Sequence, residues 1–170
     1  MSDYRVDAPR ADDSWPEPTV SLVSGLGCSL RLPMGSMFID DPSSGPGTDQ
    51  ISLPGDILIA IIPEKRVQHL SQVIEWSENQ AQRFVDQRAG ALIAQGTVSS
   101  PGREVYVCAV GFMGLSGDPR IVASVGVMDA RGRFMGLLIL WPVTDPALEP
   151  DLALVRRVIG SLEIGVLAPR

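Results

Sequence analysis

The sequence is poor in the residues that most often carry chemistry. Its 170 residues include one histidine, His69, and two cysteines, Cys28 and Cys108. The cysteines lie far apart and show none of the short spacings that are typical of zinc sites or redox motifs. We therefore expect no transition-metal site, and we expect both thiols to be free and buried.

Positive charge and long apolar runs are also scarce. The chain has 14 Lys and Arg against 20 Asp and Glu, a net charge of −6 and a pI of about 4.7. Nucleic acids and anionic membrane surfaces are bound mainly through Lys and Arg, so we expect neither as a partner. The runs "ILIAIIP" and "FMGLLILWPV" are too short to span a bilayer, which argues against membrane insertion. The N-terminus lacks a signal-peptide pattern, and we expect a cytoplasmic protein.

The segment "SLVSGLGCSLRLPMG" (21–35) invites comparison with a phosphate-binding loop or a thiol site. Gly25 and Gly27 lack the third glycine of a dinucleotide fingerprint, and no Gly-Lys-Ser/Thr follows them. A nucleophilic Cys28 would need a base, and His69 has no partner residue that would make a dyad. We interpret the segment as two strands joined through glycine-rich turns.

Other catalytic and metal-binding patterns are missing as well. The stretch "GLSGD" does not match the serine nucleophile motif G-x-S-x-G. Asp40, Asp41 and Asp49 lie in a Pro-Gly-rich stretch, but their spacing is not that of an EF-hand. We therefore expect no metal, no cofactor and no enzymatic activity.

Hydrophobic periodicity predicts an α+β fold with one antiparallel sheet flanked by two helices. A helical stripe at 69–88 includes Leu70, Val73 and Val85, and a second helix begins near Pro150. We predict a flexible acidic N-terminal arm at 1–18, a single domain at 19–165 and a loop at 40–50. Strands are predicted at 19–24, 28–32, 36–39, 56–63, 91–98, 103–113, 120–128 and 133–141.

Three segments resemble a known superfamily. They are the strand–turn–strand "LRLPMGSMFID", the helix "LSQVIEWSENQAQRFVDQ" after an apolar strand ending in proline, and the terminal "LALVRRVIGSLEI". Their order over residues 19–165 is similar to that of the PsbP-like fold superfamily. This superfamily includes photosystem accessory proteins, a Ran-GTPase-binding protein and chaperones of type VI secretion effectors. The resemblance implies an α/β/α sandwich whose known relatives are mostly non-enzymatic and bind other proteins.

Two tryptophans are candidate partner-binding residues. Trp76 falls off the Leu70–Val85 stripe of the predicted helix, so it either packs under a loop or serves as an exposed anchor. Trp15, in the acidic arm, either docks on the protein's own surface or anchors another molecule.

Methionines supply the remaining candidates. Met113, Met128 and Met135 lie in predicted sheet strands, where they either fill the core or line an apolar groove. Such a groove would accept an apolar peptide or a lipid, because methionine surfaces adapt to varied ligands.

These observations lead to one main hypothesis and one alternative. The main hypothesis is a non-catalytic intracellular protein that binds another protein as an accessory or chaperone, with a link to bacterial secretion as its sharpest form. The alternative is a small-molecule or lipid-binding domain that uses an apolar groove between sheet and helix. A homodimer is left open.

Overall fold

The computed structural model describes residues 14–40, 47–143 and 152–165. These residues form a mixed α+β fold that is mostly sheet. The strands and helices, in chain order, are β1 (Thr19–Ser24), β2 (Cys28–Pro33), β3 (Met37–Ile39), β4 (Asp49–Leu53), β5 (Ile57–Ile62), α1 (Leu70–Arg88), β6 (Ala91–Ser100), β7 (Arg103–Met113), β8 (Pro119–Asp129), β9 (Phe134–Pro142), α2 (Leu152–Ser161) and β10 (Glu163–Ile164).

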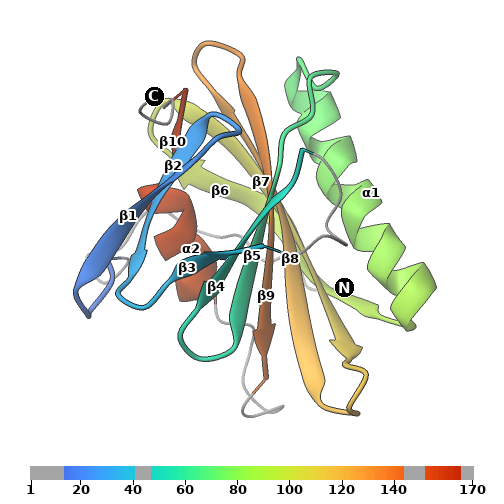
Figure 1. Ribbon diagram of the computed structural model, residues 1–170. Helices are drawn as coiled ribbons and strands as arrows, with labels where there is room; N and C mark the ends of the chain where they lie inside the picture. Colours follow the sequence, from blue (N-terminus) through green and yellow to red (C-terminus); the bar gives the residue numbers. More distant parts are fainter. Residues whose placement is uncertain (1–13, 41–46, 144–151, 166–170) are drawn as a thin grey trace.

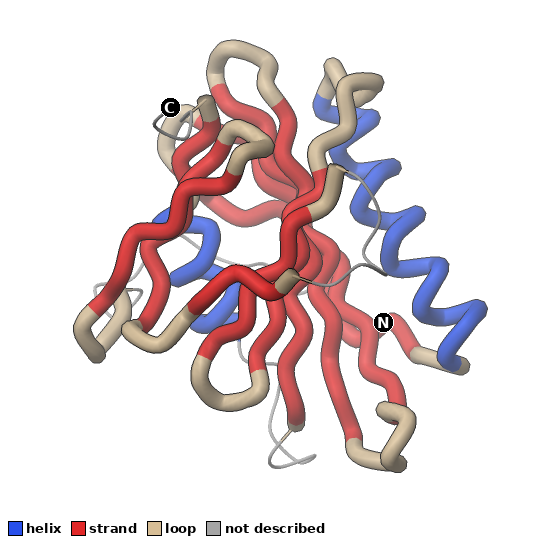
Figure 2. The backbone as a smooth tube through the Cα atoms, in the orientation of Figure 1, coloured by secondary structure: helices blue, strands red, loops and turns tan. Residues whose placement is uncertain are grey.

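The strands form two antiparallel sheets rather than the single sheet that the sequence predicts. The larger sheet has the order β3-β4-β5-β9-β8-β7-β6, and the smaller one has the order β1-β2-β10 (Figures 1 and 2). The chain leaves the smaller sheet at a turn after β2, where Gly35 has a φ of 95°. After α2 it returns to pair Glu163 with Ser29 and Ile164 with Cys28. Local patterns do not encode this return, because it joins segments from opposite ends of the chain.

The central strands of the larger sheet are covered on both faces, which explains why they are apolar. Helix α1 packs against β7 and β8 on one face (Figure 1). The other face meets α2 and the smaller sheet in the main core, to which Leu30, Val125 and Val158 belong. Side chains alternate between the two faces along each strand, so a central strand covered on both sides is apolar throughout. No helix among the described residues is long and apolar enough to cross a membrane.

Most of the predicted elements are present. Helix α1 and the four strands that follow it agree closely with the predicted ranges. The predicted loop at 40–50 is wrong at its end, because β4 begins at Asp49 and pairs with β3 and β5. Residues 41–46 of that loop and residues 1–13 of the predicted arm lie outside the described residues.

Candidate partner-binding surfaces

Trp76 lies in the core, so the expectation that it stands off the buried face of α1 is wrong. Its side chain is 8% exposed and makes an edge-on contact with Phe134, with ring centroids 5.2 Å apart. A Cβ atom on Gly136 of β9 would collide with the Trp76 ring, so the indole occupies the space that this glycine leaves. Leu70, by contrast, is 40% exposed. Because Gly136 has no side chain, α1 can pack with Trp76 facing the sheet.

The three candidate methionines do not share one surface. Met128 and Met135 are buried, at 7% and 3% exposure, and they belong to cores on opposite faces of the larger sheet. A groove lined by these two side chains is therefore ruled out, because both fill the interior. Met113 is different: it is 56% exposed at the end of β7, and Leu115 beside it is 93% exposed. The hairpin between β7 and β8 thus presents apolar side chains to solvent.

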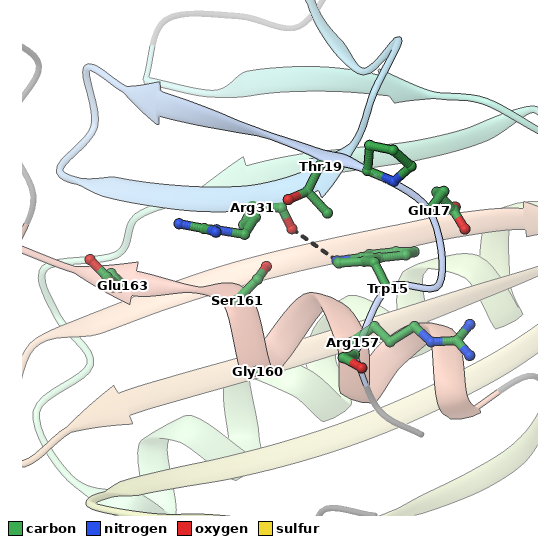
Figure 3. Close-up of a pocket in the computed structure, with 10 residues that line it drawn as sticks. Trp15, Glu17, Thr19, Arg31, Arg157, Gly160, Ser161 and Glu163 are labelled. Carbon is green, nitrogen blue, oxygen red and sulfur yellow. Dashed lines mark hydrogen bonds between the residues drawn. The ribbon is translucent and has the colours of Figure 1, made fainter. Parts of the chain in front are cut away.

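Trp15 docks on the protein's own surface, between β2 and α2 (Figure 3). Its Nε1 donates a hydrogen bond of 2.9 Å to the carbonyl oxygen of Arg31. The guanidinium carbon of Arg157 lies 5.9 Å from the centroid of the Trp15 ring, within the range of a cation–π contact. Downstream, the Pro18 carbonyl accepts a hydrogen bond from the Met34 N–H. These contacts fasten residues 14–18 to the domain.

The Trp15 side chain borders a cavity of about 660 Å³. The side chains of Arg31 and Glu163 lie on one side of the indole, and those of Glu17 and Arg157 lie on the other (Figure 3). A small-molecule site normally has a few polar groups that converge on one ligand. The charged groups here are spread around the indole, so the cavity does not define a ligand.

A second cavity, of about 600 Å³, is lined by Arg103, Arg131 and Arg133. Arg103 donates 2.8 Å hydrogen bonds to the carbonyl oxygens of Ile159 and Leu162, at the end of α2. Burial lowers the pKa of Arg103. Arg133 is paired with Asp129, with 2.7 Å between Nε and Oδ2. Two of the three guanidinium groups therefore hold the fold together.

The glycine-rich segment connects two strands, as the sequence predicts. Gly25 and Gly27 lie in the turn between β1 and β2, and the Gly27 N–H donates to the Ser24 carbonyl. Cys28 is buried, and burial together with the nearby Asp49 charge raises the pKa of its thiol to about 11. A thiol in this state is a poor nucleophile at neutral pH.

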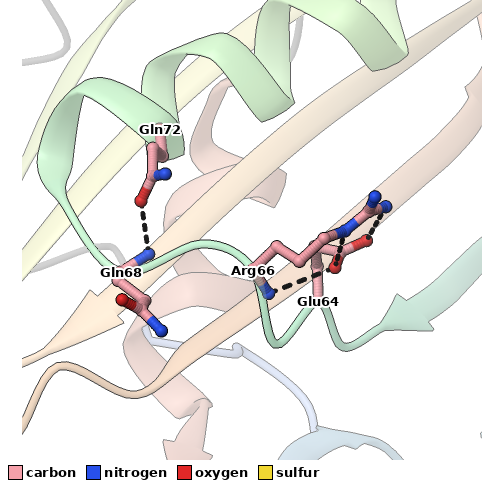
Figure 4. Close-up of polar contacts among 4 residues, drawn as sticks. All are labelled: Glu64, Arg66, Gln68 and Gln72. Atoms are coloured by element: carbon pink, nitrogen blue, oxygen red, sulfur yellow. Dashed lines mark hydrogen bonds and ion pairs between the residues drawn. The ribbon is translucent and has the colours of Figure 1, made fainter.

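His69 is the N-cap residue of α1 and is exposed. The Gln72 side chain accepts a 2.7 Å hydrogen bond from the N–H group of Gln68 (Figure 4). It also accepts one from the N–H group of His69, at 3.1 Å. Glu64 and Arg66 form an ion pair in the preceding loop. These polar contacts shape the entry to the helix. Among the residues that the structure describes, no three His, Cys, Asp or Glu side chains gather to hold a metal ion.

Strand β3 is the surface that the sequence analysis missed. Seven large apolar side chains are exposed in the described residues, and four of them lie on β3 or in the turn before it. They are Met34, Met37, Phe38 and Ile39, at 59%, 61%, 41% and 38% exposure. The run "SMFID" predicts the strand, but a consecutive apolar run normally indicates a buried one. In the structure β3 is the last strand of the larger sheet, and these side chains are exposed to solvent.

Comparison with known proteins identifies the fold. No protein-family model and no curated protein matches the chain. The solution structure of cyanobacterial PsbP (CyanoP) from Synechocystis sp. PCC 6803 superposes with a TM-score of 0.62 over 86% of this chain and 92% of that chain, at 14% identity. The crystal structure of PA94 from Pseudomonas aeruginosa, a protein of unknown function, covers 90% of this chain and 98% of that chain, at 13% identity and a TM-score of 0.44. The chain therefore has a PsbP-like fold, as its element order and terminal segments predict.

Proposed function

We propose that this chain is a non-catalytic intracellular protein that binds another protein as an accessory factor. A chaperone-like role for a bacterial secretion effector is the most specific form of the proposal. It rests on the resemblance of the sequence to the PsbP-like superfamily. The observation that carries the proposal is the cluster of four exposed apolar side chains, Met34 and Met37 to Ile39, on and beside strand β3.

An exposed apolar edge strand is costly to a protein that does not use it. The free edge of a sheet offers unpaired N–H and C=O groups, and natural proteins usually protect it with lysine, proline or a bulge. Strand β3 has only three residues, which itself limits edge pairing, but none of them, Met37, Phe38 or Ile39, is a lysine or a proline. Several large apolar side chains exposed along one unpaired strand are typical of a site of interaction with another protein.

A second surface competes with β3 for this role. Met113 and Leu115, in the hairpin between β7 and β8, are more exposed than most apolar side chains in the described residues. Met113 is also one of the residues that the sequence nominates for partner binding. Met37 and Met113 have similar exposures, 61% and 56%, so they form a matched pair for mutation.

The test is capture of a partner by the tagged full chain in its native host, followed by reconstitution of the complex from the two purified proteins. We expect one stoichiometric protein with wild type and with Met113→Lys, and at least a tenfold loss of affinity with Met37→Lys. This loss corresponds to about 1.4 kcal/mol, the scale of one buried apolar side chain with a new charge in its place. Both substitutions are at exposed positions, so circular dichroism and the unfolding midpoint should be unchanged.

Two results would count against the proposal. If no protein is captured from native cells by wild type, with or without chemical cross-linking, the accessory role fails. If the partner is lost only with Met113→Lys, protein binding stands but the β3 surface does not carry it.

A further inference from the structure

The proposed function does not specify the kind of partner protein. This inference rests on that function and uses the geometry of β3 to define the segment that the partner presents. Strand β3 pairs with β4 on one side only and is the last strand of the larger sheet. None of the described strands pairs with its other side, so an extended segment of another chain can add to the sheet there as an eighth strand. Every strand pairing described in this protein is antiparallel, and antiparallel pairing is the more stable kind.

The register of β3 shows which side chains an added strand would meet. Met37 and Ile39 pair with Ser52 and Gln50, on the face of the sheet that α1 covers farther along. Phe38 pairs with Ile51, on the face that points to the main core. The edge is therefore apolar on both faces, and an added strand needs apolar side chains at successive positions.

Charge is concentrated at one end of this edge. Asp40 follows Ile39, and continuation of the antiparallel register places it opposite Asp49 at the start of β4. Asp49 accepts a 2.5 Å hydrogen bond from the Ser24 hydroxyl. Within the part of the chain that the structure describes, neither carboxylate has an ion pair with Lys or Arg. The other end of the edge, at Gly35 and Ser36, carries no charge.

We propose that the occupant of this edge is an extended, apolar segment of another protein with a Lys or Arg at its N-terminal end. In antiparallel addition, the residue that faces Asp40 precedes those that face Ile39, Phe38 and Met37. A basic residue there would lie opposite Asp40, which has no ion pair with Lys or Arg among the described residues. The partner motif is thus one basic residue followed by three or more apolar residues in extended conformation.

A second copy of this chain fits the edge less well. Symmetric antiparallel pairing centred on Phe38 would place Asp40 opposite Ser36, so neither carboxylate would gain a cation. It would also bring together two chains that each carry a net charge of −6. The charge pattern therefore favours a different protein as the partner.

The experiment is selection of a displayed library of short random peptides on the full chain, followed by affinity measurements with the selected synthetic peptides. We expect an enriched motif of Lys or Arg followed by consecutive apolar residues. Binding should be lost with Met37→Lys and with Phe38→Lys, and retained with Met113→Lys, the exposed-methionine control. Asp40→Asn should weaken binding by about three- to fivefold, as expected for one exposed ion pair. A peptide of reversed sequence should bind more weakly than the selected one.

Several outcomes would overturn this inference. One is a library that yields no binder sensitive to both Met37→Lys and Phe38→Lys, or a motif with Asp or Glu in place of the basic residue. Another is concentration-dependent dimerisation in sedimentation that Met37→Lys abolishes, because the edge would then hold a second copy. Neither result removes the accessory role: a natural partner captured independently of β3 would leave the proposed function intact while this inference fails.

Discussion

At the scale of single residues, a missing side chain sets the position of a helix. Gly136 has no Cβ, and the Trp76 ring of α1 occupies that space. On the same face, a Cβ at Gly126 would lie 2.8 Å from a Val73 methyl carbon. These two glycines let α1 approach the sheet closely enough to bury Val73, Trp76 and Ser77. The packing of α1 therefore depends on glycine positions in strands far from it in the sequence.

Gly136→Ala should destabilise the fold by about 1–3 kcal/mol, the usual cost of overpacking a filled core. The new methyl group would collide with the Trp76 ring and with the Ile62 carbonyl oxygen, 2.9 Å from the Cβ position. The measurement is the free energy of unfolding in urea. Gly160→Ala is the control, because Gly160 lies in α2 with nothing within 4 Å of a Cβ. It should stabilise by up to about 1 kcal/mol through helix propensity. Equal stabilities of wild type and Gly136→Ala would contradict the packing described here.

At the scale of elements, the hairpin between β8 and β9 is closed by one carboxylate. Asp129 accepts hydrogen bonds from the backbone N–H of Arg131 at 3.0 Å and of Arg133 at 2.9 Å. The Arg133 side chain adds a third hydrogen bond at 2.7 Å. Burial by itself raises the pKa of Asp129, but these hydrogen bonds outweigh it, and the pKa is lowered from 3.8. The ionised form of Asp129 therefore stabilises the folded state.

Asp129→Asn should destabilise the protein by about 1 kcal/mol at pH 7, since it weakens charge-assisted hydrogen bonds at a partly exposed site. Because the folded-state pKa lies below the unfolded value, this contribution is complete above about pH 4 and is lost as the pH falls through the folded pKa. The difference between variant and wild type in urea midpoint should therefore shrink in acid. A difference that stays constant from pH 7 to about pH 2.5 would show that the carboxylate charge is not responsible.

At the scale of the whole molecule, the larger sheet has apolar packing on each of its two faces, and the two are separate. Cys28 belongs to the core between the two sheets, and Cys108 lies on the opposite face, under α1. Burial, with a smaller effect of Asp49, raises the pKa of Cys28 to about 11. Burial, with a smaller effect of Glu78, raises the pKa of Cys108 to about 12. The two thiols therefore report on the two cores independently.

Neither thiol should react with a thiol-specific reagent at pH 8 while the protein is folded, because both are buried and protonated. In urea, both should become reactive in one transition if the two cores unfold together. Cys28→Ala and Cys108→Ala variants assign the signal to each site. A thiol that reacts at clearly lower urea than the other would show that one core opens on its own.

The sequence by itself determined most of the elements. Alternating and continuous apolar runs predict β5 and the meander from β6 to β9, and helical spacing predicts α1. Turn residues predict the hairpin at Asp129–Gly132, where the Gly132 N–H donates to the Asp129 carbonyl. These features depend on neighbouring residues, so a local pattern is enough to predict them. The prediction that Trp76 lies off the buried face of the helix was wrong, because the spacing of apolar residues does not show which surface the helix packs against.

Only the tertiary structure decided how these elements combine and which side chains remain exposed. The division into two sheets arises because β1 and β2 pair with each other, with β10 added to β2, and not with the larger sheet. The close packing of α1 depends on Gly126 and Gly136. The side chains at β3 are exposed because no other element covers them, although the apolar residues resemble those of a buried strand. Whether such a side chain is exposed depends on which distant segments of the chain pack over it. Contacts between distant segments leave no periodic signal in the sequence.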